Sequence, residues 1–146
     1  MVKISVTNIK KVEAAFKKYG DEAVKELAEV TKIKAHEIEN RAKSLAPVDD
    51  GTLRQNIRAE KQESLLEWRV TSYMPYSAFQ EFGTGGLVNI PEGWESMASR
   101  FKGKGIKQIN MSPQPFMYPA FVFGRATYEK DIEDSLKHLN NKFNNG

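Results

Sequence analysis

The feature that most constrains the fold is a long amphipathic stripe that stops at a proline. Apolar or small residues recur at alternating steps of four and three: Val24, Ala28, Thr31, Ala35, Ile38, Ala42 and Leu45. This spacing places them on one face of an α-helix, and charged residues fill the other faces. Pro47 disfavours the α conformation at Ala46. The sequence therefore predicts a helix from Asp21 to Ala46.

A second long helix is predicted at the C-terminal end. Pro119 suits the first turn of a helix, where a missing N–H costs nothing. An apolar face follows it: Phe121, Tyr128, Ile132, Leu136, Leu139 and Phe143. Gly124 weakens this helix locally by about 1 kcal/mol relative to alanine. A shorter helix is expected from Asn8 up to Gly20.

Between the helices the apolar spacing falls to about two. Residues 57–72 therefore predict a pair of strands that turn at Glu63 and Ser64. A short helical turn is expected at 76–82 and a short helix after Pro91. Residues 87–108 form an irregular insertion, expected to end in a further strand. The fold class is α+β, with the two long helices packed on a small antiparallel β-sheet.

Length and composition indicate one domain over residues 1–146. The 22 basic and 19 acidic residues give a net charge of only +3, less lopsided than is usual for a nucleic-acid-binding domain. The absence of cysteine excludes disulfides and thiolate chemistry. Since no apolar run is long enough to span a membrane and no signal segment opens the chain, we expect a protein that folds in the cytoplasm without a membrane partner.

Three sets of residues could form a catalytic, phosphate-binding or metal-binding site. In each case the sequence favours a purely structural role. Asp49 and Asp50 are adjacent, so in an extended segment they point to opposite sides and do not easily share a metal. We expect instead that Asp50 caps a short turn beginning at Thr52 and that Gly51 supplies a permissive backbone. The stretch "GTGG" from Gly83 to Gly86 is not followed by the lysine or serine of a phosphate loop. His36 and His138 lie far apart on predicted helices. We therefore expect no catalytic, cofactor-binding or metal-binding residue, and no enzyme.

Four basic residues follow without an acid between them: Arg100, Lys102, Lys104 and Lys107. They could contact DNA phosphates or an acidic protein face, or form an ordinary solvated loop. Aromatic residues are more numerous than a small core needs, which is typical of a subunit interface.

Three stretches in order resemble the head-tail joining family of long-tailed bacteriophages, also called neck or tail-completion proteins. The stretches are "AKSLAPVDDGTLRQNI", "YSAFQEFGTGG" and "SPQPFMYPAF". The first matches the family motif at Ala46, Pro47, Gly51, Leu53, Arg54 and Ile57. The second matches at Tyr76, Ala78, Glu81, Phe82, Gly83 and Thr84, and the third at Gln114, Pro115, Phe116, Pro119 and Ala120. The chain departs from the motif at Asp50 and Asn56, where threonine and serine are usual, and between Gly86 and Ile109.

The resemblance implies a virion structural protein with no catalytic residue or cofactor, which forms a ring, a hexamer or a dodecamer, at the junction of capsid and tail. Its implied partners are further copies of itself, a head-closure or connector protein, a tail terminator or tail tube protein, and DNA that passes through without sequence-specific contacts. Two other functions stay open from the residues alone. One is a small DNA-binding accessory protein that uses the basic run, and the other is a hydrolase or nuclease that uses Asp49, Asp50 and a histidine.

Overall fold

The three-dimensional structure is a computed structural model that describes residues 2–6, 17–49, 51–99 and 111–145. Its elements in chain order are β1 (Val2–Val6), α2 (Asp21–Leu45), α3 (Thr52–Gln55), β2 (Ile57–Lys61), β3 (Trp68–Ser72), α4 (Ser77–Phe82), the 3-10 turn η1 (Gly85–Leu87), α5 (Glu95–Ser99) and α6 (Met117–Asn144). Two long helices beside a small antiparallel sheet confirm the predicted α+β class. The single-domain assignment and the extent of the 87–108 insertion stay predictions.

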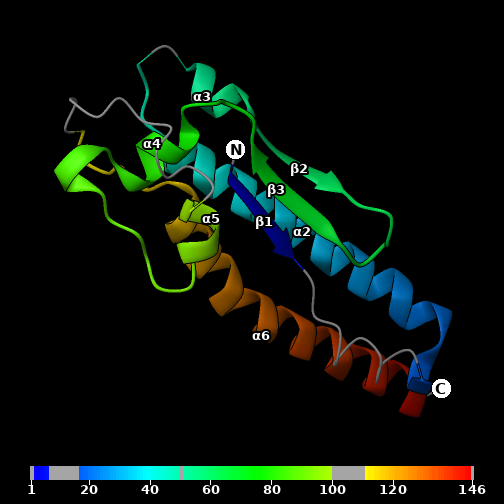
Figure 1. Cartoon of the computed structure of the whole chain (residues 1–146). Coiled ribbons are helices and arrows are strands. Elements are labelled where there is room, and N and C mark those ends of the chain that lie inside the picture. The colour runs from blue at the N-terminus through cyan, green and yellow to red at the C-terminus, as the bar shows by residue number, and fades with distance from the viewer. Residues whose placement is uncertain (1, 7–16, 50, 100–110, 146) are drawn as a thin grey trace.

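The two long helices lie side by side and run in opposite directions (Figure 1). α2 begins and ends where the sequence predicts, with Ala46 as its C-cap. The predicted stripe is correct in the middle of the helix, but its first two turns bury Ala23 and Leu27 instead of Val24 and Ala28. Leu45, at the end of the stripe, is 42% exposed. α6 begins two residues before Pro119 and buries Ala120, Gly124, Tyr128, Ile132 and Leu139.

Polar contacts join the two helices along their length. Lys34 of α2 is only 2% exposed and lies 2.8 Å from Asp131 of α6. It also pairs with Glu37 and donates to Thr127 at 2.9 Å. Burial lowers the pKa of the Lys34 amine, but these partners outweigh it, so its pKa is raised above the usual value. The charge is therefore retained inside the helix pair.

The sheet has three strands in the order β1-β3-β2, and both pairings are antiparallel. Val2 and Ile57 both pair with Ser72 across the central strand. α2 packs against β2 and β3, whereas α6 packs mainly on α2 and reaches the sheet at β1. The strand pair over 57–72 is confirmed, with its turn at residues 62–67.

One strand was not predicted, and two predicted elements fall largely outside the described residues. The N-terminal strand β1 was not predicted. Most of the helix expected from Asn8 falls on residues 8–16, which lie outside the described residues; residues 17–19 are helical. The strand expected before the C-terminal helix falls mainly on residues 102–110, which also lie outside them.

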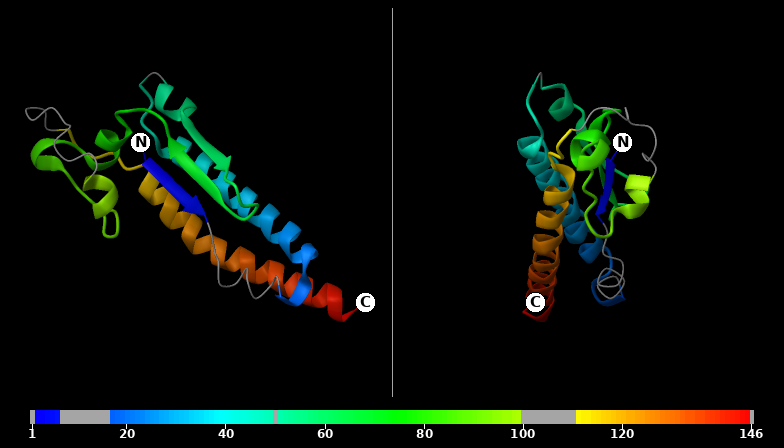
Figure 2. Two further views of the ribbon diagram at one scale, coloured as in Figure 1. Left: turned by 45° about the vertical axis from the view of Figure 1, so that its right-hand side comes forward. Right: turned by 60° about the vertical axis from the view of Figure 1, so that its left-hand side comes forward.

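The short elements α4, η1 and α5 gather at one end of the molecule, where α2 ends and α6 begins (Figure 2). The chain reaches this end after α2, after β3 and before α6. The opposite end holds the start of α2 and the end of α6, joined by a 2.6 Å ion pair between Glu22 and Lys142 and by stacking of Tyr19 on Phe143. The three motif stretches lie at the first end.

Candidate assembly surface

Glu81 connects two of the motif stretches at the centre of this end. It lies on α4, is 1% exposed, and accepts hydrogen bonds from the backbone N–H groups of Phe116, Met117 and Tyr118, each at 2.9 Å. These N–H groups lie at the start of α6. Backbone N–H groups in the first turn of a helix have no hydrogen-bond acceptor within that helix. Burial raises the pKa of the Glu81 carboxyl, and the three hydrogen bonds only partly oppose the rise. Glu81 thus anchors the start of α6 to α4.

Backbone hydrogen bonds extend this connection on both sides of Glu81. Gln114 donates its N–H to the carbonyl of Gln80 at 2.7 Å. Thr84 and Met111 bond twice, once from the Thr84 N–H to the Met111 carbonyl at 3.0 Å and once from the Met111 N–H to Thr84 Oγ1 at 2.9 Å. The second and third motifs are therefore one structural unit.

Gly83 sits where these two segments approach most closely. Its φ is +79°, and a Cβ there would lie 2.7 Å from the Met111 carbonyl oxygen and 3.0 Å from Pro113 N. Only glycine combines that conformation with so little space. Of the neighbouring motif residues, Phe82 and Phe116 are buried, Thr84 and Pro119 are half-buried, and Tyr76 and Pro115 are exposed.

The first motif forms a corner between α2 and α3. Pro47 follows the end of α2, and Gly51 adopts φ +77° and starts α3 at Thr52. Leu53 then points into the core. Pro47 and Gly51 thus turn the chain, and Leu53 returns it to the core. Asp50, the expected cap of this turn, lies outside the described residues.

Arg54, which also belongs to the first motif, lies at this corner on α3. Its side chain is half-buried, and its Nε is buried without a hydrogen-bond acceptor among the described residues. It lines a hollow of about 310 Å³ with Lys43, Ser44 and Gln55. Leu45 and Val48, which is 57% exposed, lie in the same stretch of chain.

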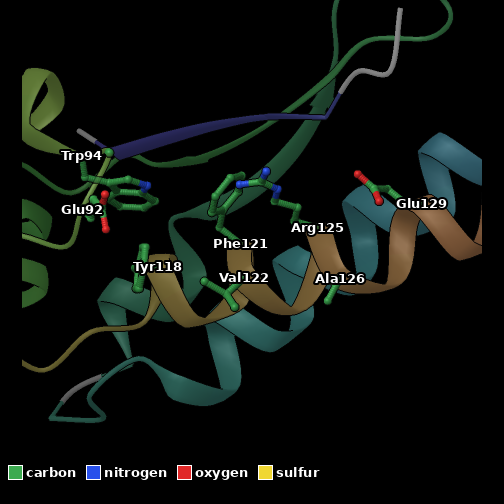
Figure 3. Close-up of a pocket in the computed structure, with 9 residues that line it drawn as sticks. Glu92, Trp94, Tyr118, Phe121, Val122, Arg125, Ala126 and Glu129 are labelled. Atoms are coloured by element: carbon green, nitrogen blue, oxygen red, sulfur yellow. The ribbon is translucent and has the colours of Figure 1, made fainter. Parts of the chain in front are cut away.

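A larger groove, of about 540 Å³, lies between α6 and the segment that leads into α5 (Figure 3). Trp94 meets Tyr118 edge-on with ring centroids 5.3 Å apart and lies 6.1 Å from Phe121. Val122, which is 46% exposed, continues the apolar lining along α6. We call the surface formed by these side chains the aromatic groove. It comprises Trp94, Tyr118, Phe121 and Val122, together with Glu92, Arg125 and Glu129.

Three charged side chains lie along the aromatic groove. Glu92 and Glu129 lie toward its two ends and Arg125 lies between them (Figure 3). None of the three forms an ion pair with another described residue. The sequence patterns did not single out Val122, Arg125 and Glu129, although their spacing from Tyr118 places them on one side of α6. The aromatic surplus was the one signal that pointed here.

The residues considered for chemistry are not brought together. His36 pairs with Glu39 at 3.0 Å, and His138 pairs with Glu26 at 2.9 Å, so each histidine has its own local partner. Asp49 is exposed, and Asp50 lies outside the described residues. Over the described residues, no group of three potential ligands is arranged to hold a metal ion. The basic run from Arg100 to Lys107 lies outside them.

No helix in the described part of the chain is both long and apolar enough to cross a bilayer.

Comparison with known proteins places the chain in a family. Residues 10–83, half of the chain, match the family described as "Bacteriophage HK97-gp10, putative tail-component". The chain belongs to this HK97-gp10-like family, and it is accordingly a bacteriophage structural protein of the virion, where its partners are other virion proteins. No curated protein and no solved structure matches it. The resemblance read from the three motif stretches agrees with this family.

Proposed function

We propose that the protein is a ring-forming subunit of the neck or the proximal tail, which joins the portal complex of the capsid to the tail. The match of residues 10–83 to a tail-component family carries this proposal. The motif end of the molecule supports it, because a frame held by backbone hydrogen bonds displays exposed apolar side chains there: Val48, Leu87, Val88, Ile90 and Val122. Three of them, Leu87, Val88 and Ile90, fall within four consecutive residues, and an exposed apolar patch of this kind is typical of a protein–protein contact.

A ring of identical subunits needs a head-to-tail contact between two different surfaces that closes by rotation. A hexamer or a dodecamer is the copy number that we favour. Its other partners would be a head-closure or connector protein on one side and a tail terminator or tail tube protein on the other. DNA would pass through the opening without sequence-specific contacts, and the ring would be assembled in the host cytoplasm.

In this role the protein performs no catalysis and needs no cofactor. Arg100, Lys102, Lys104 and Lys107 would contact a partner or line the DNA channel. Such contacts with phosphates are electrostatic and independent of sequence.

Native mass spectrometry and negative-stain microscopy test the proposal. The expected result is a closed ring of the chain alone, or of the chain mixed with purified connector or tail components. A chain that stays monomeric over the accessible concentrations and binds none of these components would contradict it.

The acid-free basic run favours one alternative, a DNA-binding accessory protein. This function predicts duplex binding whose affinity falls steeply with salt, with a slope of about −0.9 per phosphate contact in a plot of log affinity against log salt. Replacing the four basic residues with alanine would then flatten the slope by up to about 3.6. Absence of binding at low salt would exclude this alternative.

A further inference from the structure

The outer edge of β2 is closed at its centre by a side chain from α2. β2 is an edge strand, because the sheet has the order β1-β3-β2 and β2 pairs with β3 alone (Figure 1). Glu39 of α2 reaches this strand, and its Oε2 accepts the N–H of Ala59 at 3.2 Å. Without such a contact, the N–H groups of a strand edge are available to any second strand that approaches.

The ladder between β2 and β3 fixes which backbone groups of β2 point outward. Before the strand, the N–H of Tyr73 donates to the Asn56 carbonyl at 2.9 Å. After it, the N–H of Gln62 donates to the Glu67 carbonyl at 3.0 Å. Bonded residues alternate along an antiparallel strand, so the even-numbered residues of β2 face β3 and the odd-numbered ones face away. Ala59, the middle residue of β2, therefore has its N–H and carbonyl at the centre of the outer edge.

The Glu39 carboxylate is held at this edge by two contacts on its own helix. Its Oε1 accepts from Lys43 Nζ at 2.5 Å, and its Oε2 lies 3.0 Å from His36 Nδ1. The Glu39 side chain is only 13% exposed. Because its carboxylate occupies the place where a neighbouring strand would put a carbonyl group, a second strand can pair with the centre of β2 only if Glu39 moves aside.

The sequence of β2 complements itself when two copies of the strand run antiparallel. With Ala59 opposite Ala59 of a second copy, Arg58 of each copy lies opposite Glu60 of the other. Opposite charges directly across two strands stabilise their pairing. Arg58 is exposed and Glu60 is half-buried, and the Tyr73 hydroxyl donates to one oxygen of Glu60. A carboxylate can accept several hydrogen bonds, so a second copy of the chain fits this edge.

We infer that Glu39 keeps the protein from pairing with a second copy of itself through β2. While its carboxylate holds the Ala59 N–H, the contact centred on Ala59 does not form. That contact is two-fold, and a two-fold contact uses the same surface on both copies. It would join subunits in pairs and would compete with a head-to-tail contact. The inference concerns the single chain and holds whether or not the proposed ring forms.

Disulfide trapping tests the inferred contact, because the chain contains no cysteine. Residues 58 and 60 of the two copies would be a non-hydrogen-bonded pair with Cα atoms about 4.5 Å apart, a distance that a disulfide spans. Chains with Arg58→Cys and chains with Glu60→Cys are mixed under mild oxidation. The mixture is made once with Glu39 unmodified and once with Glu39→Ala in both chains. Glu39→Ala should raise the yield of the mixed disulfide dimer at least about tenfold.

Three comparisons make this result specific. Either cysteine chain alone should give little dimer, because its cysteines would lie diagonally apart across the two strands. Glu39→Gln keeps an oxygen acceptor at the edge, so its yield should stay close to that of unmodified Glu39. Glu29→Ala, at an exposed position of the same helix, should leave the yield unchanged. Equal yields with and without Glu39→Ala, or equal yields from one chain alone and from the mixture, would overturn the inference.

Amide hydrogen exchange of the unmodified chain gives a second measurement, which holds even if circular dichroism shows that Glu39→Ala does not fold. Ala59 and Lys61 both direct their N–H groups away from β3, and the bond to Glu39 is made by Ala59. The Ala59 amide should therefore exchange at least about tenfold more slowly than the Lys61 amide. Equal exchange rates at the two positions would mean that Glu39 does not close the edge, and the inference would be wrong.

Discussion

Gly124 of α6 lies directly against Ile38 of α2. A Cβ on residue 124 would be 2.3 Å from Ile38 Cδ1 and 2.4 Å from Ile38 Cγ1. The glycine that weakens α6 by its helix propensity is therefore the residue that lets the two long helices approach. The sequence shows that Gly124 lowers the stability of α6. The structure shows that this loss is offset by the close packing of α6 on α2.

Gly124→Ala should destabilise the protein even though alanine favours the helix. The propensity gain is about 1 kcal/mol, but overpacking of a core contact costs about 1–3 kcal/mol and here meets a branched side chain. Urea unfolding of Gly124→Ala, Ile38→Ala and the double variant measures the coupling. In the Ile38→Ala background the same substitution should be neutral or stabilising; an equal loss in both backgrounds would contradict this packing.

Glu81→Ala should cost about 3 kcal/mol or more, because it leaves the buried N–H groups at the start of α6 without an acceptor. Glu81→Gln keeps one oxygen but turns a donor toward an N–H group, and should cost about 1–3 kcal/mol. Chemical unfolding measures both. Glu63→Gln, at an exposed turn, is the matched control and should change stability by less than about 0.5 kcal/mol.

Gly83→Ala should destabilise strongly, since the new Cβ would meet backbone atoms of Met111 and Pro113 at a positive φ. Gly86→Ala is the natural comparison because a Cβ at residue 86 meets nothing within 4 Å. We expect a loss of more than about 2 kcal/mol for the first and a change below about 0.5 kcal/mol for the second. Thermal unfolding with equal effects at both positions would show that the close approach at Gly83 is not needed.

The lowered pKa of the Glu39 carboxyl predicts that the stability of the fold depends on pH. Burial raises the pKa of its carboxyl, but hydrogen bonds from Lys43, His36 and the Ala59 N–H outweigh burial, so the pKa lies below its usual value of 4.5. A carboxyl with a lowered pKa in the folded state stabilises the protein above its unfolded pKa, and this contribution is lost as the pH falls through the folded value. The stability difference between the unmodified chain and Glu39→Gln should therefore be greatest near neutral pH and shrink below pH 4.5. A difference that is constant over this range would exclude the linkage.

The sequence was sufficient for the long helices because their apolar spacing repeats over many turns. Pro47 and Gly51 likewise predicted the turn between α2 and α3, since their backbone preferences are local. The strand β1 was missed, because five residues carry a weak pattern and its partner β3 is more than sixty residues away along the chain. Local signals identify elements, and they do not show which distant segments pair.

The candidate assembly surface was predictable only in part. The motifs identified Glu81 and Gly83, but their role depends on contacts with residues 111–118 that no local pattern specifies. The aromatic groove was missed for the same reason: Trp94 reaches Tyr118 and Phe121 only after the chain has folded back on α6. Val122, Arg125 and Glu129 look like ordinary exposed helix positions when read alone.

Glu81 holds α6 entirely through main-chain N–H groups, and this separates two kinds of evolutionary change. Tyr118 donates its N–H to the anchor while its side chain lines the groove. A phage lineage can therefore replace the side chain at residue 118, and with it the lining of the groove, without releasing the helix. The surface of the groove can change while the scaffold beneath it stays fixed.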